Sequence, residues 1–152
     1  MPTLVAVQDQ AGNTATLGSG QVTTFAVDNT KPSVNLSYLI DGATYVAAPR
    51  AVRGADGGMT VRATFTNTAS LGPTPTLTIA STQFSVPVGP QAMNPTADPL
   101  VWEYRQAVPT SGDGTITLTV NGADPAGNTV TETNEFMRVD NSLPYVTSIT
   151  RV

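Results

Sequence analysis

Apolar residues alternate with threonine in short segments of this chain, and this pattern restricts the fold more than any other feature. In residues 115–120, Ile116, Leu118 and Val120 alternate strictly with threonines. Successive side chains of a strand point to opposite faces, so such a segment predicts a strand with one buried and one solvated face. Residues 60–66 repeat the pattern, with valine, alanine and phenylalanine facing inward. Prolines and glycines separate the segments, which is typical of an all-β chain of short strands.

Seven segments of the chain carry strand signals. They are residues 34–39, 60–66, 77–79, 84–88, 100–106, 115–120 and 129–139. Seven antiparallel strands make a constant-type immunoglobulin sandwich. We therefore predict an all-β, immunoglobulin-like β-sandwich, with strands of adjoining repeats at both ends. Pro87 predicts an edge position for the fourth strand, and Trp102 and Tyr104 are expected on the core face of the fifth.

Two of the predicted connections are longer than a hairpin requires. Residues 41–58 join the first strand to the second, and residues 89–99 join the fourth to the fifth. Binding surfaces concentrate on loops, so either connection could carry one. A solvated connection without a binding role is the simpler interpretation.

The composition argues against catalysis. The chain contains neither cysteine nor histidine. Thiolate nucleophiles, zinc–thiolate sites, disulfides and the usual general base near neutral pH are therefore excluded. Glu132 and Glu135 face opposite sides of a regular strand, and Glu103 is expected to pair with Arg105 on the surface. We predict that the chain is not an enzyme.

The charge pattern bears on partners. The net charge is −4 at pH 7, and Lys31 is the single lysine. The arginines are scattered and form no basic stripe, so nucleic acid is not an expected partner. No apolar run approaches the roughly 18 residues of a membrane-spanning helix, so membrane insertion is not expected.

Two short motifs occur twice, about one sandwich length apart. Residues 9–13, Asp-Gln-Ala-Gly-Asn, match residues 124–128, Asp-Pro-Ala-Gly-Asn, at an offset of 115 positions. Residues 27–32, Val-Asp-Asn-Thr-Lys-Pro, match residues 139–144, Val-Asp-Asn-Ser-Leu-Pro, at an offset of 112 positions. A repeat of roughly 110 residues corresponds to one sandwich.

Each motif has an expected place where two sandwiches meet. Aspartate in the first position and glycine in the fourth favour a type I turn with positive φ at the glycine. The second motif ends a sandwich, and its proline stiffens the linker that follows. We therefore divide the chain into residues 1–30, the last strands and linker of a preceding repeat; residues 31–141, a complete sandwich; and residues 142–152, the linker and first strand of a following repeat.

The paired Asp-x-Ala-Gly-Asn and Val-Asp-Asn-(Thr/Ser)-x-Pro motifs resemble the bacterial immunoglobulin-like tandem repeats of large secreted adhesins and biofilm surface proteins. The resemblance covers nearly the whole chain. It implies an extracellular location at the bacterial cell surface, a role as spacer, stalk or adhesive module, neighbouring repeats as partners, and often calcium between domains. The lack of cysteine also favours a bacterial extracellular domain.

A calcium site between domains is the one candidate for a bound ion. The turn that begins at Asp124 should lie at the end of the sandwich where the first linker arrives, close to Asp28 and Asn29. Together with Asn128, these residues offer oxygen atoms of the kind that calcium takes. Further carbonyl oxygens and waters would have to complete the coordination shell.

A second, incomplete calcium site is expected at the opposite end, from Asp140, Asn141 and Asp41. Turn chemistry is the competing interpretation for both ends. Aspartate and asparagine side chains bind nearby backbone N–H groups in turns without any metal. If calcium binds, the ion would stiffen the connection, so that the array stands out from the cell.

Two other binding modes stay open. Tyr38, Tyr45 and Trp102 are candidates for contacting a carbohydrate or a protein ligand of a host or matrix, although Trp102 fits the core better. If the chain were a whole protein, the strands predicted within residues 1–27 would have no larger sheet to join, and an isolated hairpin is only marginally stable. The chain could therefore be a subunit of an extracellular filament, assembled by donating its terminal strands to an adjacent copy.

Overall fold

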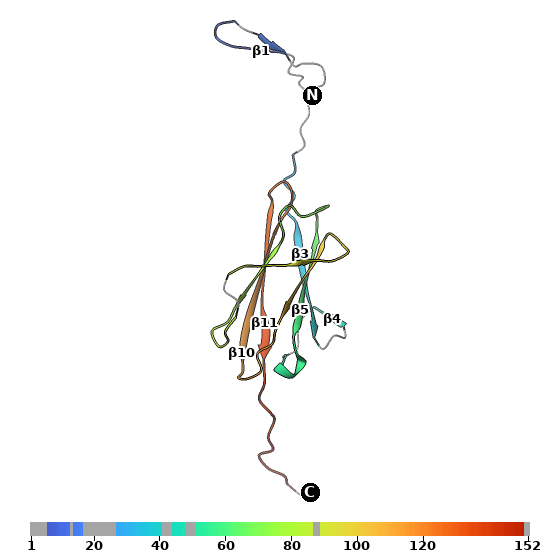
Figure 1. Ribbon diagram of the computed structural model, residues 1–152, viewed down its shortest axis with the longest axis vertical. Coiled ribbons are helices and arrows are strands. Elements are labelled where there is room, and N and C mark those ends of the chain that lie inside the picture. Colours follow the sequence, from blue (N-terminus) through green and yellow to red (C-terminus); the bar gives the residue numbers. More distant parts are fainter. Residues whose placement is uncertain are drawn as a thin grey trace.

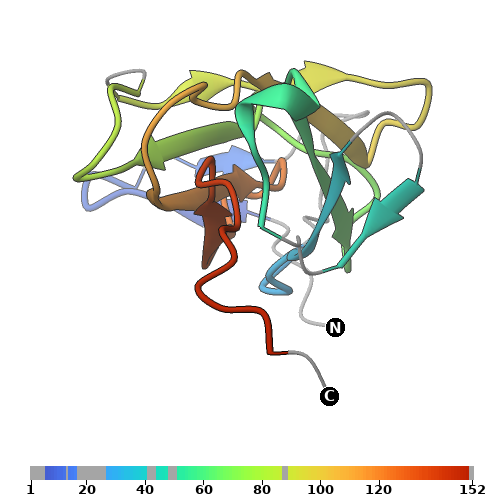
Figure 2. The same ribbon diagram turned by 90° about the horizontal axis from the view of Figure 1, so that it is seen from below.

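The chain folds into two main antiparallel sheets with almost no helix. The computed structural model describes residues 6–12, 14–16, 27–40, 44–47, 51–86 and 89–150. The strands run along the long axis of the molecule, and the chain reaches the sheets at one end and leaves them at the other (Figure 1). Viewed along that axis, the two sheets lie on opposite sides (Figure 2). The fold is all-β and sandwich-like, as the alternating pattern predicts.

The first sheet has five strands in the order β4-β3-β5-β9-β8. Their bounds are Ser33–Ile40 for β3, Thr44–Val46 for β4, Met59–Thr66 for β5, Asn94–Pro95 for β8 and Val101–Gln106 for β9. All neighbouring pairs in this sheet are antiparallel. The strands predicted at residues 34–39, 60–66 and 100–106 are confirmed as β3, β5 and β9.

The second sheet has four strands in the order β11-β10-β6-β7. Their bounds are Thr76–Ala80 for β6, Gln91–Ala92 for β7, Gly114–Ala123 for β10 and Thr129–Val139 for β11. The register of β10 with β11 shifts between Ile116 and Leu118, which face Met137 and Asn134. One extra residue of β11 therefore forms a bulge, and β11 is not a regular strand along its whole length.

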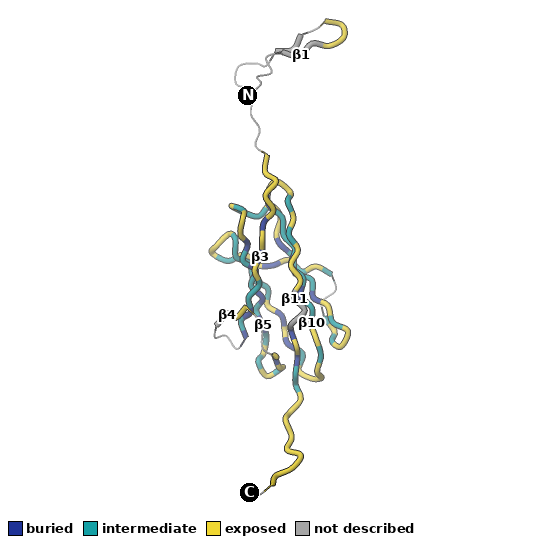
Figure 3. Tube along the Cα trace, turned by 180° about the vertical axis from the view of Figure 1, so that it is seen from behind, coloured by how far each residue is buried: buried dark blue, intermediate teal, exposed yellow. Residues whose placement is uncertain are grey.

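Side chains from both sheets fill the space between them. Ile116, Leu118 and Val120 of β10 are almost completely buried, as are Val61 and Phe65 of β5. The threonines that alternate with them are half exposed or exposed. The buried positions cluster in the middle of the sandwich, whereas the C-terminal segment is exposed along its length (Figure 3). The alternating pattern therefore predicts the core face of both strands correctly.

The prediction of a strand at residues 84–88 is wrong for residues 84–86, which form no strand in the described chain. Residues 87–88, and with them the predicted edge position of Pro87, lie outside the described residues. The hydroxyl of Ser81 accepts hydrogen bonds from the backbone N–H groups of Gln83 and Phe84, each at 3.2 Å. These N–H groups are held in a turn and cannot pair with a neighbouring strand.

The chain crosses from one sheet to the other between β7 and β8. β7 pairs with β6 in the four-stranded sheet, and β8 pairs with β9 in the five-stranded sheet. Met93, which lies between them, is buried and donates its backbone N–H to the Pro75 carbonyl oxygen at 3.0 Å. The stretch predicted as a plain connection, residues 89–99, thus contains two strands of two residues each.

Residues 41–58, predicted as a loop, also contain regular structure. β4 pairs with the end of β3, and Val52 forms a buried parallel bridge with the last residue of β11. The Val52 N–H donates to the Arg138 carbonyl oxygen and the Val52 carbonyl oxygen accepts from the Asp140 N–H, both at 2.9 Å. A single 3₁₀ turn, η1 (Gly54–Asp56), follows this bridge.

The N-terminal strands form a hairpin of their own. β1 (Ala6–Gln8) and β2 (Thr14–Thr16) pair antiparallel. Within the described part of the chain they form a separate two-stranded sheet. Figure 1 shows this hairpin beyond the end of the sandwich that residues 27–32 approach.

Candidate functional site

The turn between β10 and β11 carries Asp124 and Asn128, two of the predicted site residues. The backbone N–H of Gly127 donates to the Asp124 carbonyl oxygen at 3.1 Å, and Gly127 has a φ of 89°. Glycine adopts a positive φ more readily than other residues, so the turn has the geometry that the motif predicts. The Asp124 N–H donates to the Asn128 carbonyl oxygen at 3.1 Å and closes the hairpin.

The carboxylate of Asp124 is enclosed by this turn, and the residue is 2% exposed. Its Oδ1 accepts the backbone N–H of Asn128 and its Oδ2 accepts the Asn128 Nδ2, both at 2.9 Å. The Asn128 side-chain amide is the main cause that lowers the pKa of Asp124, against an opposing effect of burial. A carboxyl with a lowered pKa stabilises the fold near neutral pH, and this contribution is lost as the pH falls through that lowered pKa.

Asn128 also connects the turn to the first linker, residues 27–32. Its Nδ2 donates to the backbone carbonyl oxygen of Asp28 at 3.0 Å. The carboxylate of Asp28 accepts the N–H of Thr30 at 2.9 Å, and Asn29 is exposed. The structure therefore brings Asp28, Asn128 and Asp124 together at this end of the sandwich.

Hydrogen bonds engage the carboxylates of Asp124 and Asp28, two of the predicted calcium ligands at this end. Both carboxylate oxygens of Asp124 accept bonds from Asn128. In the described residues, no three His, Cys, Asp or Glu side chains gather into a group that could hold a metal. The geometry itself is that of turn chemistry, and a calcium ion would require further oxygen ligands from outside this cluster.

The N-terminal hairpin repeats the turn of β10 and β11. Asp9 Oδ1 accepts the N–H of Ala11 at 2.9 Å, the Gly12 N–H donates to the Asp9 carbonyl oxygen at 3.1 Å, and Gly12 has a φ of 87°. The strand register repeats as well. The pairs are Ala6–Thr16, Val7–Ala15 and Gln8–Thr14 in the first hairpin and Asn121–Thr131, Gly122–Val130 and Ala123–Thr129 in the second. Each pair follows the offset of 115 positions that relates the two sequence motifs.

At the opposite end of the sandwich, Asn141 binds the second linker, residues 139–144, to η1 and to the loop between β9 and β10. Its Oδ1 accepts the N–H of Gly54 at 2.8 Å, and its Nδ2 donates to the carbonyl oxygens of Pro109 at 3.1 Å and Gly112 at 2.8 Å. Glycine is needed at position 54, because a Cβ there would lie 2.4 Å from the Thr110 Cα. The Asn141 amide thus joins two separate segments, η1 and the loop between β9 and β10, to the chain that leaves β11.

Asp113 completes this network, and the sequence analysis missed it. Its Oδ1 accepts the N–H groups of Asn141 at 2.7 Å and Ser142 at 3.2 Å, and its Oδ2 accepts the Ser142 hydroxyl at 2.5 Å. The Ser142 hydroxyl is the main cause that lowers the pKa of Asp113, followed by the Asn141 N–H. The only sequence signal is its place between two glycines, which is typical of any turn.

Asp140 and Asp41 are the other residues predicted for a calcium site at this end. Asp140 Oδ1 accepts the N–H of Ser142 at 3.2 Å, and its Oδ2 lies 3.9 Å from Arg138 Nη2. Asp41 lies outside the described residues. The structure therefore places Asp140 beside Asn141 in the linker and gives no position for the third predicted ligand.

The aromatic residues considered for ligand contact are not exposed where they are described. Tyr38 is 0% exposed, so its prediction as a surface contact is wrong; it lies opposite Val61 on the core face of β3. Trp102 packs partly buried against the core, as expected, and its Nε1 donates to the Pro99 carbonyl oxygen at 3.1 Å. Tyr45 lies in β4, and its side chain is outside the description.

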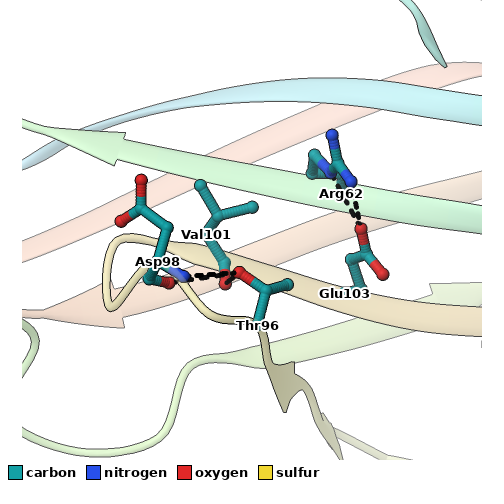
Figure 4. A network of polar contacts seen from close by, with 5 residues as sticks. All are labelled: Arg62, Thr96, Asp98, Val101 and Glu103. Carbon is teal, nitrogen blue, oxygen red and sulfur yellow. Dashed lines mark hydrogen bonds and ion pairs between the residues drawn. The ribbon is translucent and has the colours of Figure 1, made fainter.

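The polar contacts of the five-stranded sheet connect its strands (Figure 4). Glu103 accepts hydrogen bonds from Arg62 Nε at 2.8 Å and Nη2 at 2.6 Å, directly across from it in β5, whereas its predicted partner Arg105 is exposed. Nearby, the Thr96 hydroxyl donates to the Val101 carbonyl oxygen at 2.9 Å. A partly exposed ion pair contributes at most about 1 kcal/mol to the free energy of unfolding. These contacts therefore help to hold neighbouring strands together and give no sign of a binding site.

Comparisons with known proteins identify no relative of this chain. No family model matches its sequence. A search of curated proteins and a search of solved structures each give no match. The described residues include no helix with the length and apolar character needed to cross a membrane.

Proposed function

We propose that the chain is an immunoglobulin-like module of a bacterial cell-surface or secreted repeat protein, in which it acts as a spacer, stalk or adhesive element. Residues 31–141 are the complete module, residues 1–30 belong to a preceding module and residues 142–152 to a following one. The N-terminal hairpin carries this proposal, because its turn and register repeat those of β10 and β11 at one constant offset. A hairpin of this kind is what the last two strands of a preceding module would form.

The strand order supports an immunoglobulin-like sandwich. In chain order, β3, β5, β6, β9, β10 and β11 take the places of strands A, B, C, E, F and G. A, B and E then share one sheet, and C, F and G share the other, as in the constant-type immunoglobulin fold. β8 lies beside E in the place of strand D, and β7 is an additional strand beside C.

The path of the chain supports a spacer role. The first linker lies at one end of the sandwich and the second linker at the other (Figures 1 and 3). Modules connected through such linkers follow one another in a line. Repeat proteins in which each unit contacts only its neighbours extend in this way.

Sedimentation tests this proposal against the filament alternative. Leu143, Tyr145, Val146 and Ile149 are 87%, 85%, 76% and 90% exposed, an apolar segment that a following module or an adjacent copy would cover. If the chain is a module, sedimentation velocity should give the monomer mass of 15.7 kDa at all concentrations up to millimolar. A mass that grows with concentration would instead favour a filament subunit that donates its terminal strand. In that case Ile149→Asp should abolish the growth.

Calcium between modules is part of the proposal. The expected ligands are Asp28, Asn29, Asp124 and Asn128 at one end and Asp140, Asn141 and Asp41 at the other. Thermal unfolding should shift upward in millimolar calcium and return with chelator, because an ion at a hundredfold excess over its Kd stabilises the folded state by about 2.7 kcal/mol. Asp98→Asn, which alters a turn outside both sets of expected ligands, should respond like the parent chain. An unchanged melting temperature would assign both ends to hydrogen bonds alone.

A further inference from the structure

The two linkers of this chain are held by different partners. The first linker, residues 27–32, contacts the sandwich that it precedes, through the bond of 3.0 Å from Asn128 Nδ2 to the Asp28 carbonyl oxygen. The second linker, residues 139–144, contacts the sandwich that it follows, through the three side-chain bonds of Asn141. Within the residues that the structure describes, each linker therefore contacts one module only.

The two linkers are also the same structural unit. Both have the sequence Val-Asp-Asn-(Thr/Ser)-x-Pro. In both, the aspartate carboxylate accepts the backbone N–H two residues further on, from Asp28 to Thr30 at 2.9 Å and from Asp140 to Ser142 at 3.2 Å. Asp140 therefore corresponds to Asp28, and Asn141 corresponds to Asn29.

We infer that a linker between two modules makes both sets of contacts at once. Its asparagine side chain binds the module that the chain leaves, as Asn141 does, and its aspartate carbonyl oxygen accepts the Asn128 amide of the module that the chain reaches. The two sets use different atoms of adjacent residues, so they do not compete. The partner of the second linker is then the turn of residues 124–128 in a second copy of the module. This inference rests on the proposed repeat function.

A linker bound from both sides restrains the angle between consecutive modules through hydrogen bonds, with or without the proposed calcium ion. Domains joined by a single chain otherwise move relative to one another unless a substantial interface holds them. The proline of the motif adds stiffness, and Pro32 is buried where β3 begins. The hydrogen bonds therefore supply the rigidity that a spacer requires.

Backbone ¹⁵N relaxation of the full chain tests each half of the inference. In the parent chain, the amides of residues 28–31 and 140–142 should have order parameters near the rigid value of about 0.85. Asn128→Ala should lower the values for residues 28–31 below about 0.6 and leave residues 140–142 unchanged. Asn141→Ala should have the reverse effect.

Two further variants separate the linker contact from the turn. Asp124→Ala removes the carboxylate that Asn128 binds within the turn but leaves the amide that binds Asp28, so the first linker should stay ordered. Asn121→Ala removes a 2.7 Å bond with Thr131 in the same hairpin and should leave both linkers ordered. A first linker that stays ordered in Asn128→Ala, or that loosens equally in Asp124→Ala, would overturn the inference.

Sedimentation reports on the proposed function separately. A chain that remains monomeric while its first linker is unaffected by Asn128→Ala retains the module proposal and loses only the two-sided linker. A chain that polymerises through its terminal strands overturns the module proposal, whatever the relaxation data show.

Discussion

Replacing Phe65 with alanine should lower the free energy of unfolding by about 3–5 kcal/mol, because it removes a buried aromatic ring and leaves a cavity. Phe65 is 1% exposed and lies near the end of β5, where its ring covers Gly122 of the facing sheet. Urea unfolding followed by tryptophan fluorescence measures the loss. Thr66→Ala, an exposed neighbour in the same strand, is the control and should stay within about 0.5 kcal/mol of the parent. If Phe65→Ala lost no more unfolding free energy than Thr66→Ala, the result would contradict the buried position of the Phe65 ring.

The contact of Phe65 with Gly122 provides a reciprocal test. A Cβ on residue 122 would lie 2.6 Å from the Phe65 Cε1, so Gly122→Ala forces the ring to move and should cost about 1–3 kcal/mol. Phe65→Leu makes room for that methyl group. The double variant should therefore lose less unfolding free energy than the sum of the losses in the two single variants. Strictly additive losses would show that the two residues do not touch.

Replacing Asn141 with alanine should cost about 2–4 kcal/mol, because three backbone groups lose their partner in one substitution. These are the N–H of Gly54 and the carbonyl groups of Pro109 and Gly112. Asn29→Ala is the matched control, since Asn29 is the corresponding residue of the first linker and is exposed. It should change the unfolding free energy by less than about 0.5 kcal/mol. Equal losses in the two variants, measured by urea unfolding, would contradict the role of Asn141.

The strands that build the core could be predicted because the information for them is local. Successive side chains of a strand point to opposite faces, so the alternation of apolar and polar residues predicts the buried face without information on distant contacts. β7 and β8 escaped prediction because two residues are too few to show a period. At residues 84–86 the alternation is misleading, because the hydroxyl of Ser81 accepts the N–H groups of Gln83 and Phe84 and holds the start of this segment in a turn.

The ends of the sandwich could be predicted only where the repeat supplied long-range information. The duplicated motifs predict that the linker and the turn lie close together, and the bond between Asn128 and Asp28 joins them. Asp113 gives no such signal, because its partners Asn141 and Ser142 follow 28 and 29 residues later. A turn aspartate looks the same in sequence whether its carboxylate faces water or another segment. The sequence likewise cannot show that the Asn141 amide binds three backbone groups at once.

The bridge between Val52 and the end of β11 has a mechanical consequence. Its two hydrogen bonds, to the Arg138 carbonyl oxygen and from the Asp140 N–H, lie where the chain leaves the sandwich. Tension applied through the linkers pulls along β11, so it shears these bonds and the adjoining strand pairs together instead of peeling them apart singly. Bonds loaded together share the force, which slows the forced unfolding that limits a protein under load. A stalk made of such modules would therefore hold its length in flowing liquid.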